Sequence, residues 1–431
     1  MTTEVPAPPS LWRNRDFLVL WAGQIISTLG ASVTATALPL LVLALTRSPS
    51  DAGLVGAAGT LPYLIAHLPA GTLADRWNRR RIMIVSELTA GLALATVPLA
   101  LGLDVLTVAQ LAVVTFAQGT CFAFFGVTES AALPVIVPDA LLPAALAQNE
   151  AKSRGAALAG PPLGGLLFGV SRALPFVADA LSYAVGAVAL LFVRRDLQGE
   201  RSGEPQSLWQ DTRRGLSWLW RHRLVRTAVL LVAASNLIFQ ALALTLVLLA
   251  QRLDASPGDI GLMFGIYGGG GFLGALAAGR LHSRFSPKAV IIGVNWVWAA
   301  LLPLLAVAPS PLLLGLIAAG TAFVGPMWNV VLVTYLMTLV PNDLLGRVAS
   351  AAKTLSWGVL PLGSLSAGYL LSTVGPVRTV LVLTAAMLAI AIAGTLSPAV
   401  RHAPPLTAAP PPRPLRGGPG RASRRNPRPR G

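Results

Sequence analysis

The feature that most constrains this chain is a series of long apolar runs. Each run is about 20 residues long, which is the length that a helix needs to cross roughly 30 Å of hydrocarbon. The runs lie near residues 17–45, 52–74, 82–103, 105–127, 148–170, 174–193, 226–250, 258–280, 288–308, 311–336, 353–373 and 377–397. Only 12% of the 431 residues are charged, against about 25% in soluble proteins. The sequence therefore predicts an all-α integral membrane protein with twelve transmembrane helices.

The polar segments between and beyond these runs divide the chain into five parts. We expect a cytoplasmic arm over residues 1–16, a six-helix bundle over 17–193, a cytoplasmic central loop over 194–225, a second six-helix bundle over 226–397, and a basic, Pro-rich tail over 398–431. The composition of the tail predicts disorder. Within the central loop, residues 207–220 predict an amphipathic surface helix with Leu208, Trp209, Leu216 and Leu219 toward lipid.

The basic residues are distributed unevenly between the two sides of the predicted membrane. If the N-terminus is cytoplasmic, only Arg47, Arg172, Arg252 and Arg378 of the 33 Lys and Arg fall on the outer side, and two of the others lie between spans four and five. By the positive-inside rule, we expect a multi-pass plasma-membrane protein with both termini in the cytoplasm. The net charge of +16 is then explained by the orientation of the chain in the membrane. Binding of nucleic acid by the basic tail is the alternative explanation.

The two halves of the sequence resemble each other. Gly71, Leu73 and Arg76 recur 208 positions later as Gly279, Leu281 and Arg284, and Pro162-Leu163-Gly164 recurs 199 positions later as Pro361-Leu362-Gly363. Val137-Pro138 similarly recurs as Val340-Pro341. An even number of spans in each half makes the repeats parallel, related by an axis along the membrane normal.

A basic hairpin, Gly71-Thr72-Leu73-Ala74-Asp75-Arg76-Trp77-Asn78-Arg79-Arg80-Arg81, separates the second and third apolar runs. It resembles the signature between spans two and three of the major facilitator superfamily. The matching residues are Gly71, Leu73, Ala74, Asp75, Arg76, Arg79 and Arg80, and Asn78 stands where the family has a second glycine. The resemblance extends over about residues 11–397 and implies two pseudo-symmetric six-helix bundles around a central cavity.

The same hairpin carries a hypothesis about gating. Asp75 ends span two on the side where span eleven begins, and a helix N-terminus attracts a carboxylate. Asp75 with Arg76 and Arg79, in a hairpin that also contains Gly71 and Arg80, is therefore predicted to latch the halves together on the inner side. The alternative is that these charges only set the topology.

The fifth span contains Gly160-Pro161-Pro162-Leu163-Gly164-Gly165. This stretch resembles the antiporter signature of the superfamily, and its matching residues Gly160, Pro161, Gly164 and Gly165 imply export. The prolines favour a bend and the glycines permit close helix contact, so a tightly packed helix is the alternative. Similarity to exporters of macrolides, other drugs and siderophores also extends to Arg13-Asn14-Arg15-Asp16-Phe17, Leu38-Pro39-Leu40-Leu41 and Asp179-Ala180-Leu181-Ser182.

Proton coupling is left open by the sequence. Two charged positions that the resemblance implies are absent, because Ala31 follows Leu29-Gly30 and Thr115 replaces an arginine of span four. The remaining candidate proton carriers lie toward the ends of their spans and are Glu87, Glu129, Asp179 and His67. Each could instead be a capping, snorkelling or packed residue.

Neutral polar residues occupy the middle of several spans. Those predicted to line a substrate cavity are Gln24, Ser32, Thr36, Gln118, Asn236, Gln240, Asn295 and Asn329. A mostly apolar cavity with scattered hydrogen-bonding groups suits amphiphilic organic molecules. Any one of these residues could instead make a hydrogen bond between helices.

The sequence therefore predicts a secondary-active exporter of a hydrophobic or amphiphilic small molecule, such as a drug, antibiotic or siderophore, that works by alternating access. An importer or facilitator of the same fold, and a membrane sensor or assembly partner without transport, remain alternatives. We expect no enzymatic activity, cofactor or metal, since the chain has no P-loop, H-E-x-x-H or C-x-x-C motif. The expected partners are the substrate and the lipid bilayer, without nucleic acid, and we expect a monomer.

Overall fold

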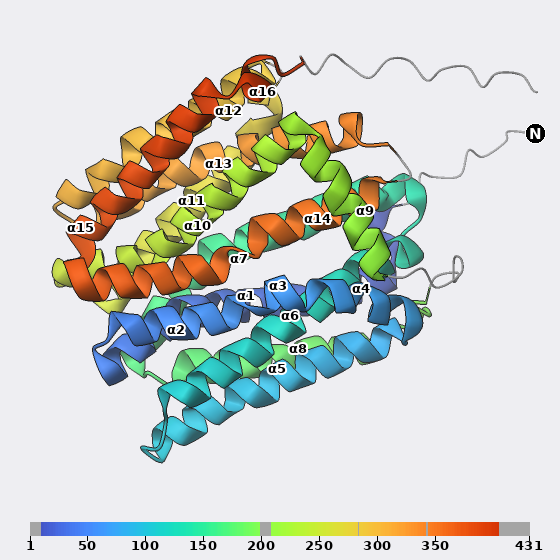
Figure 1. Ribbon diagram of the computed structural model, residues 1–431. Coiled ribbons are helices and arrows are strands. Elements are labelled where there is room, and N and C mark those ends of the chain that lie inside the picture. Colours follow the sequence, from blue (N-terminus) through green and yellow to red (C-terminus); the bar gives the residue numbers. More distant parts are fainter. Residues whose placement is uncertain (1–9, 199–207, 283, 342–343, 405–431) are drawn as a thin grey trace, which may run out of the picture.

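The structure, a computed structural model, describes residues 10–198, 208–282, 284–341 and 344–404, and these residues form helices and no strands (Figure 1). The spans of the first half are α1 (Arg15–Thr46), the interrupted run of α2 (Pro49–Thr60), α3 (Pro62–Ile65) and α4 (His67–Arg76), then α5 (Arg79–Gly102), α6 (Val108–Ile136), α7 (Leu142–Val170) and α8 (Leu174–Phe192). Those of the second half are α10 (Arg223–Arg252), α11 (Pro257–His282), α12 (Pro287–Leu301) with η3 (Leu302–Val307), α13 (Pro311–Leu339), and α14 (Leu345–Trp357) followed by α15 (Leu360–Leu396). The short elements are η1 (Leu11–Arg13), η2 (Asp139–Leu141), α9 (Leu208–Arg221) and α16 (Pro398–Arg401).

Twelve spans follow from these helices. In the described part of the chain, nine stretches are long and apolar enough to cross a membrane, and one of them, Leu345–Leu396, is 52 residues long. That stretch holds two spans, because α15 reverses at Gly375, which has a φ of 77° and precedes Pro376. Glycine adopts this φ easily, and a residue before proline avoids the helical region. The α2–α4 run and the more polar α7 supply the other two.

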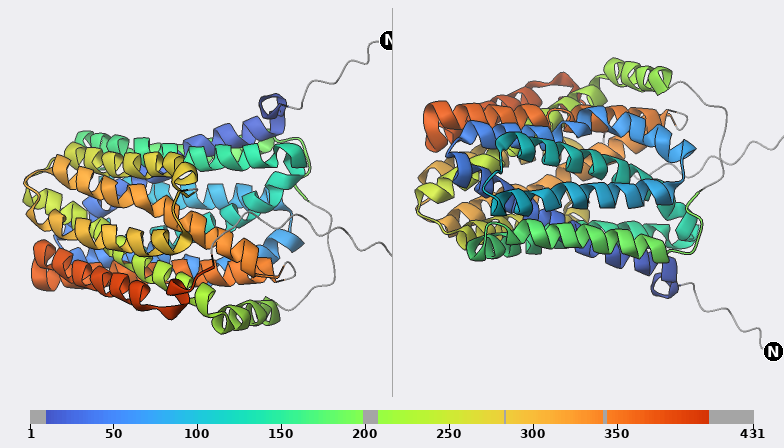
Figure 2. Two further views of the ribbon diagram at one scale, coloured as in Figure 1. Left: turned by 90° about the horizontal axis from the view of Figure 1, so that it is seen from above. Right: turned by 90° about the horizontal axis from the view of Figure 1, so that it is seen from below.

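The halves lie side by side (Figure 1). Each presents apolar side chains outward, including Val307 in the second half, which is 76% exposed. Val170, Leu103 and Leu92 are at least 70% exposed, as expected for surfaces that contact lipid. Asn14 donates to the carbonyl of Ile136 at the end of α6, and the hydroxyl of Tyr335, near the end of α13, donates to Pro404. Both described chain ends therefore lie at one end of the bundle, which also carries α9 and is called here the terminal face (Figure 2).

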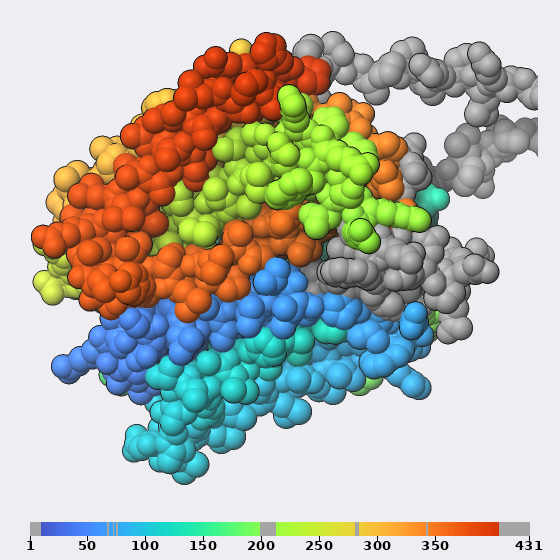
Figure 3. All heavy atoms as spheres, in the orientation of Figure 1, coloured from blue at the N-terminus to red at the C-terminus, as the bar shows by residue number. Residues whose placement is uncertain are grey.

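Two equivalent helix pairs join the halves, α2 with α15 and α7 with α11. The helices α2 and α11 begin with related sequences 208 positions apart, Ser48-Pro49-Ser50-Asp51 and Ser256-Pro257-Gly258-Asp259, and each serine caps its helix. A Cβ added at Gly53 would lie 2.8 Å from the Cα of Gly368, and one at Gly261 would lie 3.0 Å from the Cα of Gly165. These contacts close the junction at the face opposite the terminal face, and the seam between α2 and α15 is visible in Figure 3.

The connection between spans four and five is shorter than the apolar pattern predicts. α6 extends to Ile136 and α7 begins at Leu142, so Glu129 and Lys152 lie within helices. Their side chains form an ion pair with an N–O distance of 3.1 Å and are largely buried. Because its charge is paired, Glu129 can lie buried within α6, beyond the apolar run that ends near residue 127.

Two predictions for the polar segments need correction. α9 lies where a surface helix is predicted, but Leu219 is fully buried, since α9 packs against α14 and Leu219 cannot face lipid. The side chains of Leu208 and Trp209 lie outside the described residues. The predicted disordered tail begins with a helical turn, α16, in which Val400 is buried, and residues 405–431 lie outside the described part.

Candidate functional site

A cavity of about 710 Å³ lies between the two halves and is lined by residues from both. Its volume falls within the range of about 300–1,000 Å³ that is typical of small-molecule sites. Five of the residues predicted to line it do so, namely Ser32, Thr36, Asn236, Gln240 and Asn329. Asn236 donates to the carbonyl of Ser356, and Gln240 donates to the hydroxyl of Ser364. Both amides thus keep a carbonyl oxygen that can accept a hydrogen bond.

The other three predicted residues do not line this cavity. Gln24 donates to a carboxylate oxygen of Glu87 at 2.7 Å. Asn295 donates to the carbonyl of Ile291, one turn earlier in its own helix, at 2.7 Å. Gln118 lies beside Tyr183 of α8. Their depth in the membrane is readable from sequence, but the direction in which each side chain faces is not.

The aromatic wall of the cavity comes entirely from the second half. Its residues are Phe239, Phe264, Tyr267, Trp298 and Trp328. Phe239 and Trp298 make an edge-to-face pair with ring centroids 4.8 Å apart, and the indole of Trp298 donates to the carbonyl of Thr321. Apart from Arg154, the first half lines the cavity with small, aliphatic and hydroxyl side chains, so the two sides of the cavity differ chemically.

Arg154 is the lining residue that sequence reasoning misses. The charge count assigns it to the connection between spans four and five, although it falls within the predicted run 148–170. In the structure it lies in α7 and lines the cavity. Among the described residues, it is the only one with a charged side chain in the cavity lining. Its spacing of seven and eleven residues from Pro161 and Gly165 places all three on one face of α7, a signal that could have identified it.

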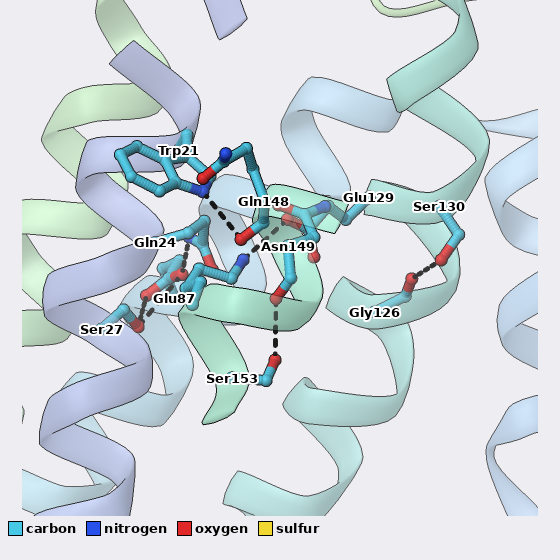
Figure 4. Close-up of polar contacts among 11 residues, drawn as sticks. Trp21, Gln24, Ser27, Glu87, Gly126, Glu129, Ser130, Gln148, Asn149 and Ser153 are labelled. Atoms are coloured by element: carbon cyan, nitrogen blue, oxygen red, sulfur yellow. Dashed lines mark hydrogen bonds and ion pairs between the residues drawn. The ribbon is translucent and has the colours of Figure 1, made fainter. Parts of the chain in front are cut away.

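Glu87 is buried between helices of the first half. It is 3% exposed, and it accepts hydrogen bonds from Gln24 at 2.7 Å and from Ser27 at 3.1 Å, both on α1 (Figure 4). On its other side, a Cβ added at Gly186 of α8 would lie 2.9 Å from its Cδ. Glu87 therefore links α1, α5 and α8 and does not line the central cavity.

Asp179 is the second buried acid and is fully enclosed on α8. Its Oδ1 accepts from Ser182 at 3.1 Å, whereas Oδ2 has no hydrogen-bond partner among the described residues. A Cβ added at Gly30 would lie 2.5 Å from Oδ1. The resemblance implies an acid immediately after Leu29-Gly30, where this chain has Ala31. Here the acid beside Gly30 comes from α8 instead.

Glu129 and His67, the other two candidate proton carriers, give less evidence for that role. Glu129 is paired with Lys152 at 3.1 Å, and the side chains are 18% and 6% exposed. This pairing suits a structural role, because separating a buried ion pair leaves an uncompensated charge. The side chain of His67 lies outside the described residues.

The arginines of the hairpin bind backbone carbonyls of the first half. Arg79 donates to Ala131 at 2.8 Å and to Leu197 at 3.2 Å, and Arg80 donates to Leu190 and Leu191 at the end of α8. A cation at a helix C-terminus satisfies unpaired carbonyls and stabilises the helix dipole. These bonds attach the hairpin to its own half.

The rest of the predicted latch is described only in part. Arg76 is exposed, and a Cβ added at Gly71 would meet nothing within 4 Å. The side chain of Asp75 lies outside the described residues. A latch between the halves therefore stays a prediction.

The glycines of the span-five motif form two different contacts. Gly160 and Gly164 face α1, where a Cβ added at Gly164 would lie 2.6 Å from the carbonyl oxygen of Val33. Gly165 faces Gly261 of α11, in the other half. α7 runs as one helix through Pro161 and Pro162. The motif thus joins α7 to both its own half and the partner half.

Comparisons with known proteins agree with this architecture. A family described as transmembrane secretion effector matches residues 7–409. The chain is similar to the multidrug efflux pump Tap of Mycolicibacterium fortuitum, with 28% identity over 411 residues that cover 90% of this chain and 97% of that protein. It is also similar to macrolide efflux protein A of Streptococcus pyogenes, with 24% identity over 191 residues that cover 44% of this chain and 47% of that protein.

Solved structures with the same fold include a mutant of the nucleoside transporter NupG. Its TM-score is 0.73 at 13% identity, covering 88% of this chain and 99% of that one. A bacterial homologue of the iron transporter ferroportin, in an inward-facing state, has a TM-score of 0.70 at 14% identity and covers 90% of this chain and 99% of that one. The predicted major facilitator fold is confirmed, and the chain belongs to the transmembrane secretion effector family of that superfamily.

Proposed function

We propose that this protein exports amphiphilic small molecules, such as drugs, antibiotics or siderophores, by secondary active transport. The observation that carries the proposal is the cavity of about 710 Å³ between the two halves, and rocking of these halves is the proposed route of alternating access. Its lining combines an aromatic wall with a few polar groups, which suits a ligand that is mostly apolar. The efflux activities named for Tap and for macrolide efflux protein A support the direction of transport.

The terminal face is assigned to the cytoplasm in this proposal, with the protein in the plasma membrane as a monomer. The distribution of Lys and Arg supports that orientation. The close contacts of Gly53 with Gly368 and of Gly261 with Gly165 support a conformation closed at the outer face. In the opposite conformation, the hairpin with Asp75 would hold the inner ends of the halves together.

Proton antiport is the proposed energy source, with Glu87 as the principal proton carrier. An acid buried among α1, α5 and α8 can gain or lose a proton only when the surrounding helices admit water, which couples its titration to their movement. Asp179 lies in the same half and on α8, so it is the second candidate. Glu129 is the weakest candidate because Lys152 already neutralises it. No enzymatic step is part of this proposal.

The test measures accumulation of the uncharged dye N-phenyl-1-naphthylamine in cells with and without the protein, before and after an ionophore collapses the proton gradient. An exporter lowers accumulation, and the ionophore abolishes that difference. Raised accumulation would indicate an importer, and no change would indicate a sensor or assembly partner.

A matched pair of variants controls for expression. Gly164→Leu should block export because Val33 leaves no room for a side chain. Gly169→Leu on the same helix should retain export, because a Cβ added at Gly169 meets nothing within 4 Å. Equal activity of the two variants would contradict the role of the α1–α7 contact in transport.

A further inference from the structure

We propose that Arg154 binds an acidic group of the exported molecule, so that the preferred substrates are amphiphilic acids carrying a carboxylate, sulfonate or phosphate. This inference rests on the proposed export function and narrows its substrate class. Neither the neutral polar residues of the spans nor the similarity to efflux proteins identifies a charge preference. The inference comes from Arg154, which is the one charged side chain among the described residues that line the cavity.

The helical geometry of α7 directs Arg154 toward the second half. Pro161 and Gly165, which share its face, lie against Gly261 of α11. At the level of Arg154, α11 has Gly271, where an added Cβ would lie 3.7 Å from Nη1 of Arg154. Tyr267, one turn earlier in α11, also lines the cavity. The guanidinium thus lies at the junction between the halves, where a ligand would contact both.

Arg154 keeps donors available for a ligand. Its Nε donates to Glu150 at 2.8 Å. No other hydrogen bond is made by its side chain to the described residues. The Nη1 and Nη2 groups form the planar fork that binds carboxylate or phosphate in a bidentate manner. Glu150 is 59% exposed and is not part of the lining, so water screens its charge more than that of Arg154, which is 33% exposed.

A second buried donor points to the same ligand chemistry. Trp328 lines the cavity and is 2% exposed, and its Nε1–H has no hydrogen-bond partner among the described residues. Indole and guanidinium nitrogens can only donate. Among the described lining residues, Arg154 and Trp328 keep N–H groups without a partner and none is a carboxylate. The lining therefore suits an anion, which is rich in hydrogen-bond acceptors, whereas a cationic group would meet a like charge.

The test compares two dyes that share one aromatic skeleton, 8-anilino-1-naphthalenesulfonate, which is an anion, and uncharged N-phenyl-1-naphthylamine. Binding to the purified full-length protein in detergent is measured by dye fluorescence. The wild type should bind the sulfonate more tightly. Arg154→Gln should weaken sulfonate binding by roughly 30-fold, as expected for loss of one partner of a buried charge pair, and should change the affinity for the uncharged dye less than about twofold.

Three further measurements keep the result interpretable. Arg154→Lys retains the charge without the bidentate fork, so its affinity for the sulfonate should lie between those of wild type and Arg154→Gln. Arg172→Gln removes an exposed arginine from the connection after α7 and should bind both dyes as the wild type does. Size-exclusion chromatography establishes that each variant is folded.

Equal weakening of both dyes by Arg154→Gln, or no weakening of either, would overturn the inference. So would tighter binding of the uncharged dye by the wild type. If cells export the uncharged dye but the protein does not bind the sulfonate more tightly than the uncharged dye, the inference fails and the proposed function stands. If neither dye is bound or exported, both fail.

Discussion

The third helices of the two halves, α5 and α12, begin 208 residues apart, at Arg79 and Pro287. Glu87 and Asn295 are separated by the same interval and are both buried. Glu87 accepts hydrogen bonds from two residues of a neighbouring helix, whereas Asn295 donates to its own helix and its Oδ1 has no partner in the described chain. Equivalent positions thus hold an ionisable group in the first half and a neutral one in the second.

The cavity lining shows the same difference between a charged first half and a neutral second half. The first half contributes its charge, through Arg154, and the second half contributes all five of its aromatic residues. The duplicated framework therefore carries two chemistries: the first half holds the groups suited to proton coupling and charge recognition, and the second offers a broad apolar surface. The variants below test this division in order of decreasing effect.

The buried ion pair of the first half should have the largest effect on stability. The positions 203 residues after Glu129 and 199 residues after Lys152 hold Leu332 and Ala351, so the second half has no counterpart. Glu129→Gln should lower the free energy of unfolding by about 3 kcal/mol, because it leaves Lys152 buried without a partner. Combining it with Lys152→Met should recover most of that loss. Thermal unfolding in detergent provides the measurement, and a single variant as stable as the wild type would show that the pair is dispensable.

Glu87→Gln should have the next largest effect, on transport. Glutamine keeps the size and most of the hydrogen bonding of the side chain but cannot release a proton, so efflux driven by an imposed pH gradient should fall at least about 100-fold, or about 2.7 kcal/mol in the barrier. Asn295→Ala, at the equivalent position, should reduce it less than about threefold. Dye efflux from proteoliposomes measures both rates. Comparable losses would place coupling in both halves and remove the asymmetry.

Sequence reasoning predicts the framework well because hydrophobic length and charge placement determine it. The turn at Gly375-Pro376 and the ends of α8 and α11 fall within a few residues of their predicted places. Sequence reasoning predicts the cavity lining less well, because the depth of a residue in the membrane does not determine the direction in which its side chain points. Gln24 and Ser32 lie two turns apart on α1, yet one binds Glu87 and the other lines the cavity. Arg154 is missed because its charge suggests a loop.

The third largest effect is expected from substitutions of the glycines at the junction of the halves. Gly53→Val and Gly261→Val place a side chain against Gly368 and Gly165, respectively, so each should lower stability by about 1–3 kcal/mol. Gly71→Ala and Gly279→Ala are the matched controls, because each lies in a helix where an added Cβ meets nothing within 4 Å. These two should be neutral or stabilising. Equal effects of Gly53→Val and Gly261→Val would show that the two interfaces are energetically symmetric, even though the halves differ chemically.

The smallest effect is expected in the aromatic wall. Phe239→Leu removes the edge-to-face contact with Trp298 while keeping an apolar side chain, and such a pair contributes about 0.5–1.5 kcal/mol beyond its buried area. Phe239 also lines the cavity. If its ring makes a contact of similar energy with the aromatic dye, binding of N-phenyl-1-naphthylamine should weaken about two- to tenfold. In the first half, Leu38→Val removes one methylene from the lining and should change binding less, since a buried methylene contributes about 0.8 kcal/mol when fully enclosed and Leu38 is only half-buried. A larger loss with Leu38→Val would mean that the aliphatic side of the cavity holds the ligand, and the aromatic residues of the second half would then serve packing rather than recognition.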